Sequence, residues 1–292
     1  MPDGAATGSH RVAKPAPQSE QSRSPAVLWW HALLRAIAVL NLGLWSLAAL
    51  SVTGAGVATP TKTDATVYIQ LILCAAYVLG CGFRSFLPVH DIPRNVLVDS
   101  RLSSVLVGRT VATLAELSFA AQWALILHQV AVLTHSPLGQ AVSIAIVPLI
   151  ALAQGCCWHA VLTTAQRGHV VENSIWGVSA ALVVISLLTI GPHRIMELYP
   201  PTILWCIGGC TYVGFMFFFD VPMYWARWVA DQANNRQYLG ISQGLGDVRR
   251  RWTVSYRWED WKTEVLWMSL YFSGGVWISI SLVYASAALG AR

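Results

Sequence analysis

The chain has 292 residues, of which 55% are hydrophobic and only 11% are charged. A soluble domain usually carries about 25% charged residues, so this composition argues against a water-soluble globular fold. The net charge of +5 is small, and the basic residues flank apolar segments. We therefore interpret them as a membrane-orientation signal and expect no nucleic-acid partner.

Residues 1–25 are rich in Ser, Pro, Ala and Gln and lack an apolar core, which is typical of a disordered cytoplasmic tail and not of a cleavable signal peptide. Residues 26–292 predict a single all-α domain, a bundle of seven transmembrane helices. About 20 apolar residues are needed to cross a bilayer, and seven stretches meet this requirement. Their predicted ranges are 27–55, 66–88, 104–133, 138–164, 170–191, 200–221 and 263–289.

Lys and Arg residues are divided very unequally between the two sides of these spans. Three lie on one side, at Lys62, Arg194 and Arg292, and the other sixteen lie in or beside the tail and the connections after the second, fourth and sixth spans. Because cytoplasmic connections carry an excess of basic residues, the N-terminus is expected in the cytoplasm and the C-terminus outside. This pattern predicts a multi-pass protein of an inner or plasma membrane or an endomembrane.

Glu116 is the most informative polar residue, because it lies about twelve residues into the third predicted span. An ionised carboxylate at that depth is costly, so such a residue usually faces the bundle interior and serves a function. One face of the span carries, at helical spacing, Arg109, Thr113, Glu116 and Trp123. We expect Glu116 to donate a proton in catalysis, and Arg109 and Trp123 to bind substrate. The alternative is an interhelical hydrogen bond or ion pair without catalysis.

A second polar group surrounds the connection between the fourth and fifth spans. His159 lies near the end of the fourth span, and His169, Glu172 and Asn173 follow at spacings that place them on one helical surface. We expect His159, His169 and Glu172 to take part in acid–base catalysis and Asn173 to bind substrate. His169, Glu172 and Glu116 are also a plausible ligand set for a divalent metal. The sequence leaves open a metal, no cofactor, or a purely structural role.

The connection between the second and third spans is rich in charged residues and histidine. Arg94 is expected to bind a phosphate or carboxylate of the substrate, or a headgroup of the anionic cytoplasmic leaflet. A solvated loop is the alternative. The charged and histidine residues of this segment are Arg84, His90, Asp91, Arg94, Asp99 and Arg101.

The longest connection, 222–262, is predicted to be a cytoplasmic loop. Asp220 followed by Pro222 is typical of a helix start, with the aspartate as N-cap and the proline in the first turn. Asp220, Tyr224 and Arg227 would then share one helical face. We expect Asp220 to act as an acid and Tyr224 and Arg227 to bind substrate.

The second half of this connection carries glycines and tryptophans. Gly240, Gly244 and Gly246 predict the end of the helix that begins near Asp220. The alternation of large and polar residues over 252–258 predicts a short strand or an extended amphipathic segment. Its tryptophans are either anchors at the headgroup level or walls of a substrate pocket.

The chain has six cysteines, and all of them lie in or at the edge of apolar stretches. This placement does not favour a disulfide framework, and we interpret them mainly as small packing residues, with a redox or metal role for Cys206 and Cys210 as the alternative. The six are Cys74, Cys81, Cys156, Cys157, Cys206 and Cys210.

These patterns favour an integral membrane enzyme that acts on a lipid or isoprenoid-like substrate. The chemistry would be acid–base, such as cyclisation or isomerisation, or metal-assisted, in a cavity open to the cytoplasmic leaflet. Tryptophan faces would stabilise a cationic intermediate. The expected partners are membrane lipids and a hydrophobic small molecule.

Two other functions stay open. Intramembrane carboxylates and histidines also build proton and ion pathways, so a proton- or ion-coupled transporter or channel is the first alternative. A non-catalytic scaffold or receptor, with 222–262 as a docking surface, is the second.

Overall fold

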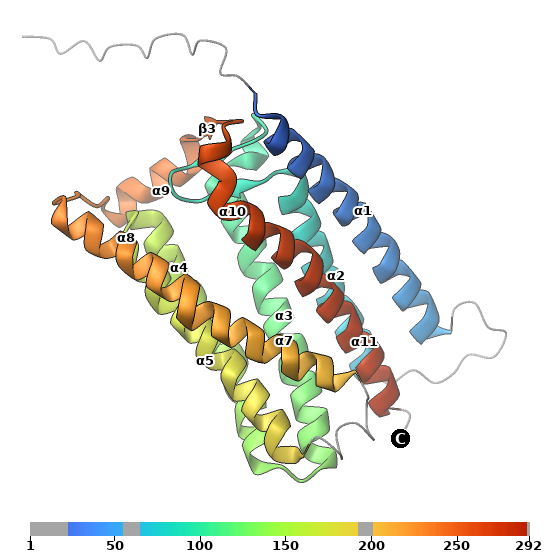
Figure 1. Cartoon of the computed structure of the whole chain (residues 1–292). Coiled ribbons are helices and arrows are strands. Elements are labelled where there is room, and N and C mark those ends of the chain that lie inside the picture. The colour runs from blue at the N-terminus through green and yellow to red at the C-terminus, as the bar shows by residue number, and fades with distance from the viewer. Residues whose placement is uncertain (1–22, 55–64, 192–200, 291–292) are drawn as a thin grey trace, which may run out of the picture.

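A computed structural model describes residues 23–54, 65–191 and 201–290 (Figure 1). Most of the predicted tail at 1–25 lies outside the described residues. The described chain is almost entirely helical, which confirms the predicted all-α class. Within it, seven helical segments are long and apolar enough to cross a membrane: α1 (Pro25–Thr53), α2 (Ala65–Phe86), α3 (Val105–Leu133), α4 (Pro137–Thr163), α5 (Arg167–Ile190), and the composite segments Thr202–Ala233 and Trp258–Gly290.

The first five segments agree with the predicted spans to within a few residues at each end. Local signals explain several boundaries. Ser104 accepts a hydrogen bond from the Val107 amide at the start of α3, and Ser136 accepts one from the Gly139 amide at the start of α4. These side chains satisfy amide groups that the first helical turn leaves free.

The sixth segment is longer than predicted, because the helix does not restart at Asp220. The helix α7 (Thr202–Phe215) continues through a π-helical turn, η2 (Met216–Asp220), into α8 (Val221–Ala233). The predicted N-cap role of Asp220 is therefore wrong. Pro222 cannot donate a backbone hydrogen bond, and the chain accommodates it by widening the turn that ends two residues earlier, at Asp220, without breaking the helix.

The seventh segment also contains a π-helical turn. The helix α10 (Trp258–Leu270) passes through η3 (Tyr271–Gly275) into α11 (Val276–Gly290). Asn41 of α1 donates a hydrogen bond of 2.7 Å to the Phe272 carbonyl, so a side chain from another helix satisfies a backbone group in the widened turn. π-Helical turns are rare and frequently lie at functional sites.

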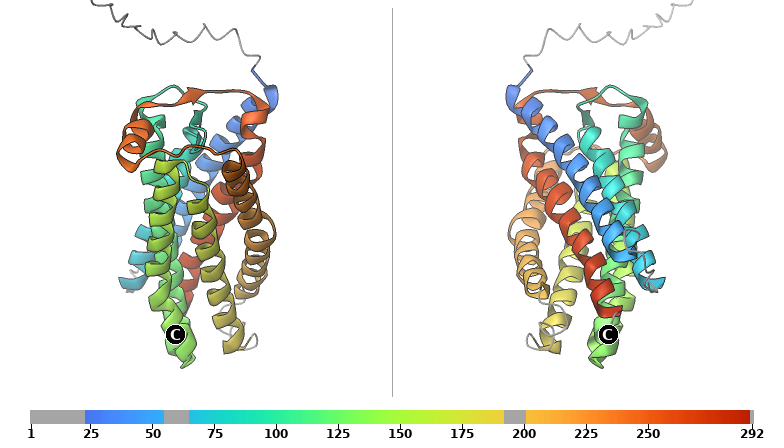
Figure 2. Two further views of the ribbon diagram at one scale, coloured as in Figure 1. Left: turned by 90° about the vertical axis from the view of Figure 1, so that its left-hand side faces the viewer. Right: turned by 90° about the vertical axis from the view of Figure 1, so that its right-hand side faces the viewer.

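The segments run alternately up and down, and α3 packs between α2 and α4 (Figures 1 and 2). α1 and α11 cover α2, whereas α7 and α8 pack against α5. Many large apolar side chains face outward; Leu33, Val39, Ile72, Ile144 and Phe218 are each more than half exposed. Such a continuous apolar exterior is atypical of a monomeric soluble protein.

One end of the bundle, which we call the sheet end, carries a small three-stranded sheet. Strand β1 (Val89–His90) pairs antiparallel with β2 (Asn95–Val96), and β2 pairs parallel with β3 (Thr253–Val254). The sheet joins the connection after α2 to the connection before α10, as Figure 1 shows. The predicted strand within 252–258 is thus present, although only two residues long.

The rest of the predicted loop 222–262 is mainly helical. It contains α8 and a second short helix, α9 (Ile241–Arg250). The helix from the sixth segment ends at Ala233, before Gly240, and Gly244 and Gly246 both lie inside α9, so the prediction that these glycines end that helix is wrong. Gly244 is needed inside α9 for packing. A Cβ at this position would lie 2.0 Å from the Leu162 carbonyl oxygen, so only glycine lets α9 approach the end of α4 this closely.

Candidate functional site

A buried ion pair on α3 forms the deepest part of the polar site at the sheet end. The Arg109 guanidinium donates hydrogen bonds of 2.9 Å to both carboxylate oxygens of Glu116, two helical turns further along α3. Gln154 of α4 accepts a 2.9 Å bond from Arg109 and donates a 2.5 Å bond to Glu116. Glu116 is thus buried in the bundle interior and held by two fixed partners.

The pair His169 and Glu172 lies at the start of α5. His169 Nδ1 is 2.8 Å from a Glu172 carboxylate oxygen, and both side chains are buried. The Tyr224 ring of α8 covers the imidazole, with 5.0 Å between ring centroids. The predicted spacing therefore does bring the imidazole and the carboxylate together, and the carboxylate fixes the orientation of the ring.

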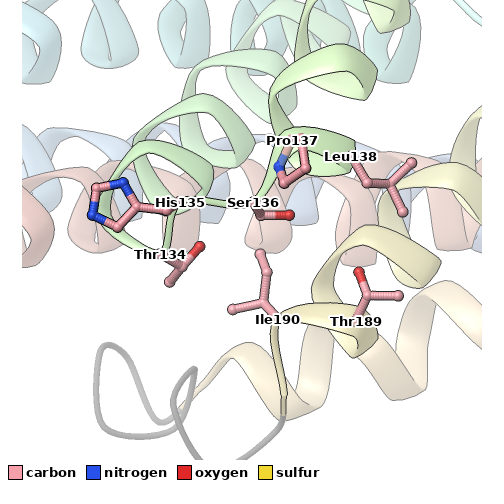
Figure 3. Close-up of a pocket in the computed structure, with 7 residues that line it drawn as sticks. All are labelled: Thr134, His135, Ser136, Pro137, Leu138, Thr189 and Ile190. Atoms are coloured by element: carbon pink, nitrogen blue, oxygen red, sulfur yellow. The ribbon is translucent and has the colours of Figure 1, made fainter.

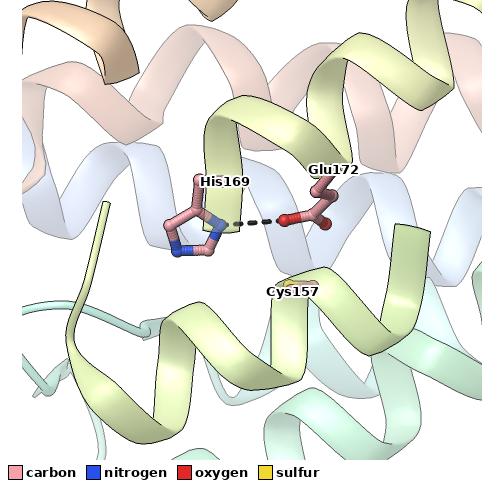
Figure 4. A group of neighbouring side chains, drawn as sticks. All are labelled: Cys157, His169 and Glu172. Carbon is pink, nitrogen blue, oxygen red and sulfur yellow. Dashed lines mark hydrogen bonds and ion pairs between the residues drawn. The ribbon is translucent and has the colours of Figure 1, made fainter. Parts of the chain in front are cut away.

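Cys157 of α4 completes a group that sequence reasoning missed. Figure 4 shows its sulfur facing His169 and Glu172, and the three potential ligand atoms lie within 4.8 Å of one another. Cys157 was interpreted as a packing residue. The signal in the sequence was the tight turn between α4 and α5. Cys157 lies before this turn, and His169 and Glu172 lie after it. Each is within about two helical turns of it, so the three residues can meet when the helices pack side by side.

Glu116 does not belong to this three-residue group, although it was the third residue of the predicted metal set. Its carboxylate is bonded to Arg109 and Gln154. Arg109 interacts electrostatically with Glu116, Cys157 and Glu172, so the ion pair and the three-residue group are neighbours.

Asp220 reaches the same site from the π-helical turn η2. It interacts electrostatically with Glu172, Glu264 and His169. Gly177 of α5 permits this approach, because a Cβ there would lie 2.8 Å from the Phe217 ring. The widened turn and the glycine together bring Asp220 of the sixth segment next to the polar residues of α5.

The connection between α2 and α3 closes the site with a histidine and an aspartate. His90 Nε2 lies 3.3 Å from a carboxylate oxygen of Glu264, and Asp91 lies 3.8 Å from Arg109. Asp91 Oδ1 and Arg109 Nε are buried and have no hydrogen-bond partner within the described chain. Six parts of the chain therefore contribute ionisable groups to one region: the connection after α2, α3, α4, α5, η2 and α10.

The other predicted site residues take different positions. His159 is exposed on α4, about 200° around the helix from Cys157, whereas Asn173 is half-buried on α5. Trp123 packs edge-on against Trp205, with 5.4 Å between ring centroids. The Arg227 guanidinium lies over the Tyr224 ring at 5.2 Å.

Arg94 is not part of a solvated loop. It is 1% exposed and donates hydrogen bonds to Asp247 of α9, to the Asp91 carbonyl and to the Val161 carbonyl of α4. These contacts fasten the connection after α2 to α9 and to the last turns of α4. The predicted role of Arg94 in substrate binding stays a prediction.

A surface pocket lies at the other end of the bundle. It measures about 430 Å³ and is formed by the turn between α3 and α4 and the end of α5 (Figure 3). Its lining residues are Thr134, His135, Ser136, Pro137, Leu138, Thr189 and Ile190. The polar groups around Glu116 and His169 are packed against one another, so the predicted open vestibule stays a prediction.

Polar side chains also continue below Glu116 toward the middle of the bundle. Gln70 and Gln122 each donate a hydrogen bond to the other's backbone carbonyl, and the Ser279 hydroxyl donates a 2.5 Å bond to the Gln122 side chain. All three residues are completely buried. Sequence reasoning missed this network, because uncharged amides inside apolar stretches give little local signal.

Comparison with protein-family models, with curated proteins and with solved structures gives no match for this chain.

Proposed function

We propose that the protein is a multi-pass membrane enzyme that performs acid–base chemistry on a lipid or isoprenoid-like substrate, with the sheet end in the cytoplasm. The observation that carries the proposal is the buried His169–Glu172 pair, held against Asp220 and the Arg109–Glu116 ion pair. Active sites that transfer protons are rich in buried ionisable side chains with other charged groups close by.

In this proposal His169 accepts the proton. Glu172 fixes the orientation of the imidazole and stabilises it once it is protonated, as a carboxylate does for a catalytic histidine. Asp220 lies near this pair on a separate segment, η2, and returns a proton to the product in this proposal. The two groups lie on different segments, so one substrate placed between them meets a base and an acid.

The role of Glu116 is to position Arg109. Both carboxylate oxygens of Glu116 accept hydrogen bonds from Arg109, and one of them also accepts a hydrogen bond from Gln154, so fixed partners occupy the carboxylate. The Arg109 guanidinium also interacts electrostatically with Asp91, Cys157 and Glu172, and its Nε is buried without a hydrogen-bond partner within the described chain. It is therefore suited to bind an anionic part of the substrate, such as a phosphate or carboxylate.

In this proposal, aromatic rings next to the polar site contact the apolar part of the substrate. Phe215 of α7 and Trp267 of α10 stack with 6.2 Å between centroids, and Trp267 lies 5.5 Å from Tyr271. Tyr271 interacts electrostatically with Glu116, so this aromatic row begins at the polar site. Ring faces of this kind attract a cationic centre and pack against an isoprenoid chain.

Membrane insertion and orientation are supported by the apolar exterior and by the distribution of basic residues. The sheet end carries the start of α1 and the connections in which Lys and Arg are concentrated (Figure 2). Under the positive-inside rule this end faces the cytoplasm and the C-terminus faces outward.

Turnover by purified protein in nanodiscs of host lipid tests the proposal. Samples with and without protein are incubated with the host's lipid and isoprenoid extract, and mass spectrometry compares the products. We expect a product that depends on the protein and is lost in the His169→Gln and Glu172→Gln variants. His128→Gln is the matched control, because His128 lies near the opposite end of α3 and should leave turnover unchanged.

Product formation that persists in both variants at the wild-type rate would overturn the assignment of His169 as the base. Absence of any protein-dependent product, together with ion flux in proteoliposomes, would overturn the enzyme and favour a transporter. The specific observation in favour of a transporter is the buried network of Gln70, Gln122 and Ser279, which extends the polar interior below Glu116.

A further inference from the structure

We infer that Cys157, His169 and Glu172 form a binding site for a zinc ion. The ion would lie between α4 and α5 at the sheet end, among the three side chains that Figure 4 draws. Any catalytic use of the ion rests on the proposed function, whereas the presence of the ion does not.

The geometry is that of a compact ligand set. The sulfur, one imidazole nitrogen and one carboxylate oxygen all lie within 4.8 Å of one another, and the three residues are buried. Zinc binds sulfur at about 2.3 Å and nitrogen or oxygen at about 2.0–2.2 Å. Ligand atoms around one zinc ion are therefore separated by less than about 4.6 Å, and small side-chain movements suffice to bring these three into range.

The ligand chemistry selects zinc over the common hard cations. A thiolate and an imidazole are poor ligands for Mg²⁺ and Ca²⁺, which prefer oxygen, but are typical ligands of zinc. One thiolate and one carboxylate neutralise the two charges of the ion. Cys157 would lose its thiol proton to solvent on binding, because the thiolate is the ligand.

The packing of α4 against α5 preserves this arrangement. Gly168 precedes His169, and a Cβ there would lie 2.6 Å from the Cys156 carbonyl oxygen and 2.7 Å from the Ala160 Cβ. Only glycine allows the start of α5 to lie this close to α4. The close approach is what places His169 and Glu172 opposite Cys157.

Three protein ligands leave a fourth position for water or substrate, which is typical of catalytic and not of structural zinc sites. Asp220 and Tyr224 are the residues of the sixth segment that border this region. In the metal-bound state the ion replaces the hydrogen bond between His169 and Glu172 as the link between these two side chains. Both are then ligands, so the acid–base roles proposed for them above apply to the protein without the ion.

Metal content of the purified protein tests the inference. The protein is isolated in detergent without chelator, and elemental analysis measures zinc per chain before and after dialysis against zinc sulfate. We expect about one zinc per chain in the wild type, and less than about one tenth of that in Cys157→Ala and His169→Ala, because removing one of three ligands weakens binding severely. Cys156→Ala, which changes the adjacent cysteine, should keep its zinc.

Cobalt substitution provides a second measurement that does not depend on folding of the variants. Wild-type protein that has been stripped of metal and loaded with Co²⁺ should show the thiolate-to-cobalt charge-transfer absorption, and Cys156→Ala should show the same band. Wild-type protein without bound zinc after dialysis, or with zinc but without this band when loaded with cobalt, would refute the site.

The zinc site and the proposed enzyme can fail separately. Turnover by metal-free protein would remove the ion from the mechanism and leave the acid–base proposal intact. One zinc per chain without any protein-dependent product would support the site and contradict the enzyme.

Discussion

The ion pair between Arg109 and Glu116 gives the most direct test of the site's energetics. Replacing Arg109 with methionine keeps most of the side-chain length but removes three charge-assisted hydrogen bonds, two to Glu116 and one to Gln154. The Glu116 side chain is only 10% exposed, so its charge stays buried without its cationic partner. Breaking a buried pair in this way costs about 3–5 kcal/mol.

That cost predicts a large fall in thermal stability. For a protein of this size about 1 kcal/mol corresponds to roughly 2–4 °C, so Arg109→Met should lower the melting temperature by about 6–20 °C. The melting temperature is measured in detergent by thermal shift. The double variant Arg109→Met with Glu116→Gln should recover a substantial part of the loss, because it no longer buries an unpaired carboxylate.

Arg251→Met is the control for loss of a basic residue at the surface. Arg251 also forms an ion pair, with Asp247, but its side chain is 64% exposed. Exposed pairs contribute at most about 1 kcal/mol, so this variant should melt close to the wild type. If Arg109→Met melts as high as Arg251→Met, or if the double variant is no more stable than Arg109→Met, Glu116 is not a carboxylate held by Arg109.

Further predictions concern packing, the sheet end and orientation. Gly168→Ala should lower both the melting temperature and the zinc content, since the added methyl group overpacks the contact between α4 and α5 at a cost of about 1–3 kcal/mol. Gly155→Ala is the control and should change neither, because no atom lies within 4 Å of the added Cβ. Equal behaviour of the two variants would contradict the packing argument. Arg94→Leu should lower the melting temperature by about 6 °C or more, because it removes a buried guanidinium from Asp247 and from the Asp91 and Val161 carbonyl groups. An unchanged value would show that Arg94 does not fasten the sheet end. Leu245 is exposed on α9. A cysteine at this position should react with a membrane-impermeant maleimide only after the cells are permeabilised. Labelling of this cysteine in intact cells would reverse the proposed orientation.

Much of the fold was predictable because its signals are local. Seven apolar stretches and their proline- and serine-containing boundaries depend only on nearby residues, and five of the seven segments lie where the sequence predicts them. The pairing of His169 with Glu172 was predictable for the same reason, since residues three apart share a helical face. The inward position of Glu116 follows from the cost of exposing a carboxylate to lipid.

The tertiary structure alone decided which helices meet at the site. Cys157 joins His169 and Glu172 only because Gly168 lets α4 and α5 pack closely, and Asp220 reaches them only because a π-helical turn carries the sixth segment past Pro222. Gln154 is the partner of Glu116 for a similar reason, as it comes from a neighbouring helix. Contacts between helices depend on the rotation and separation of whole segments, which no single stretch of sequence encodes.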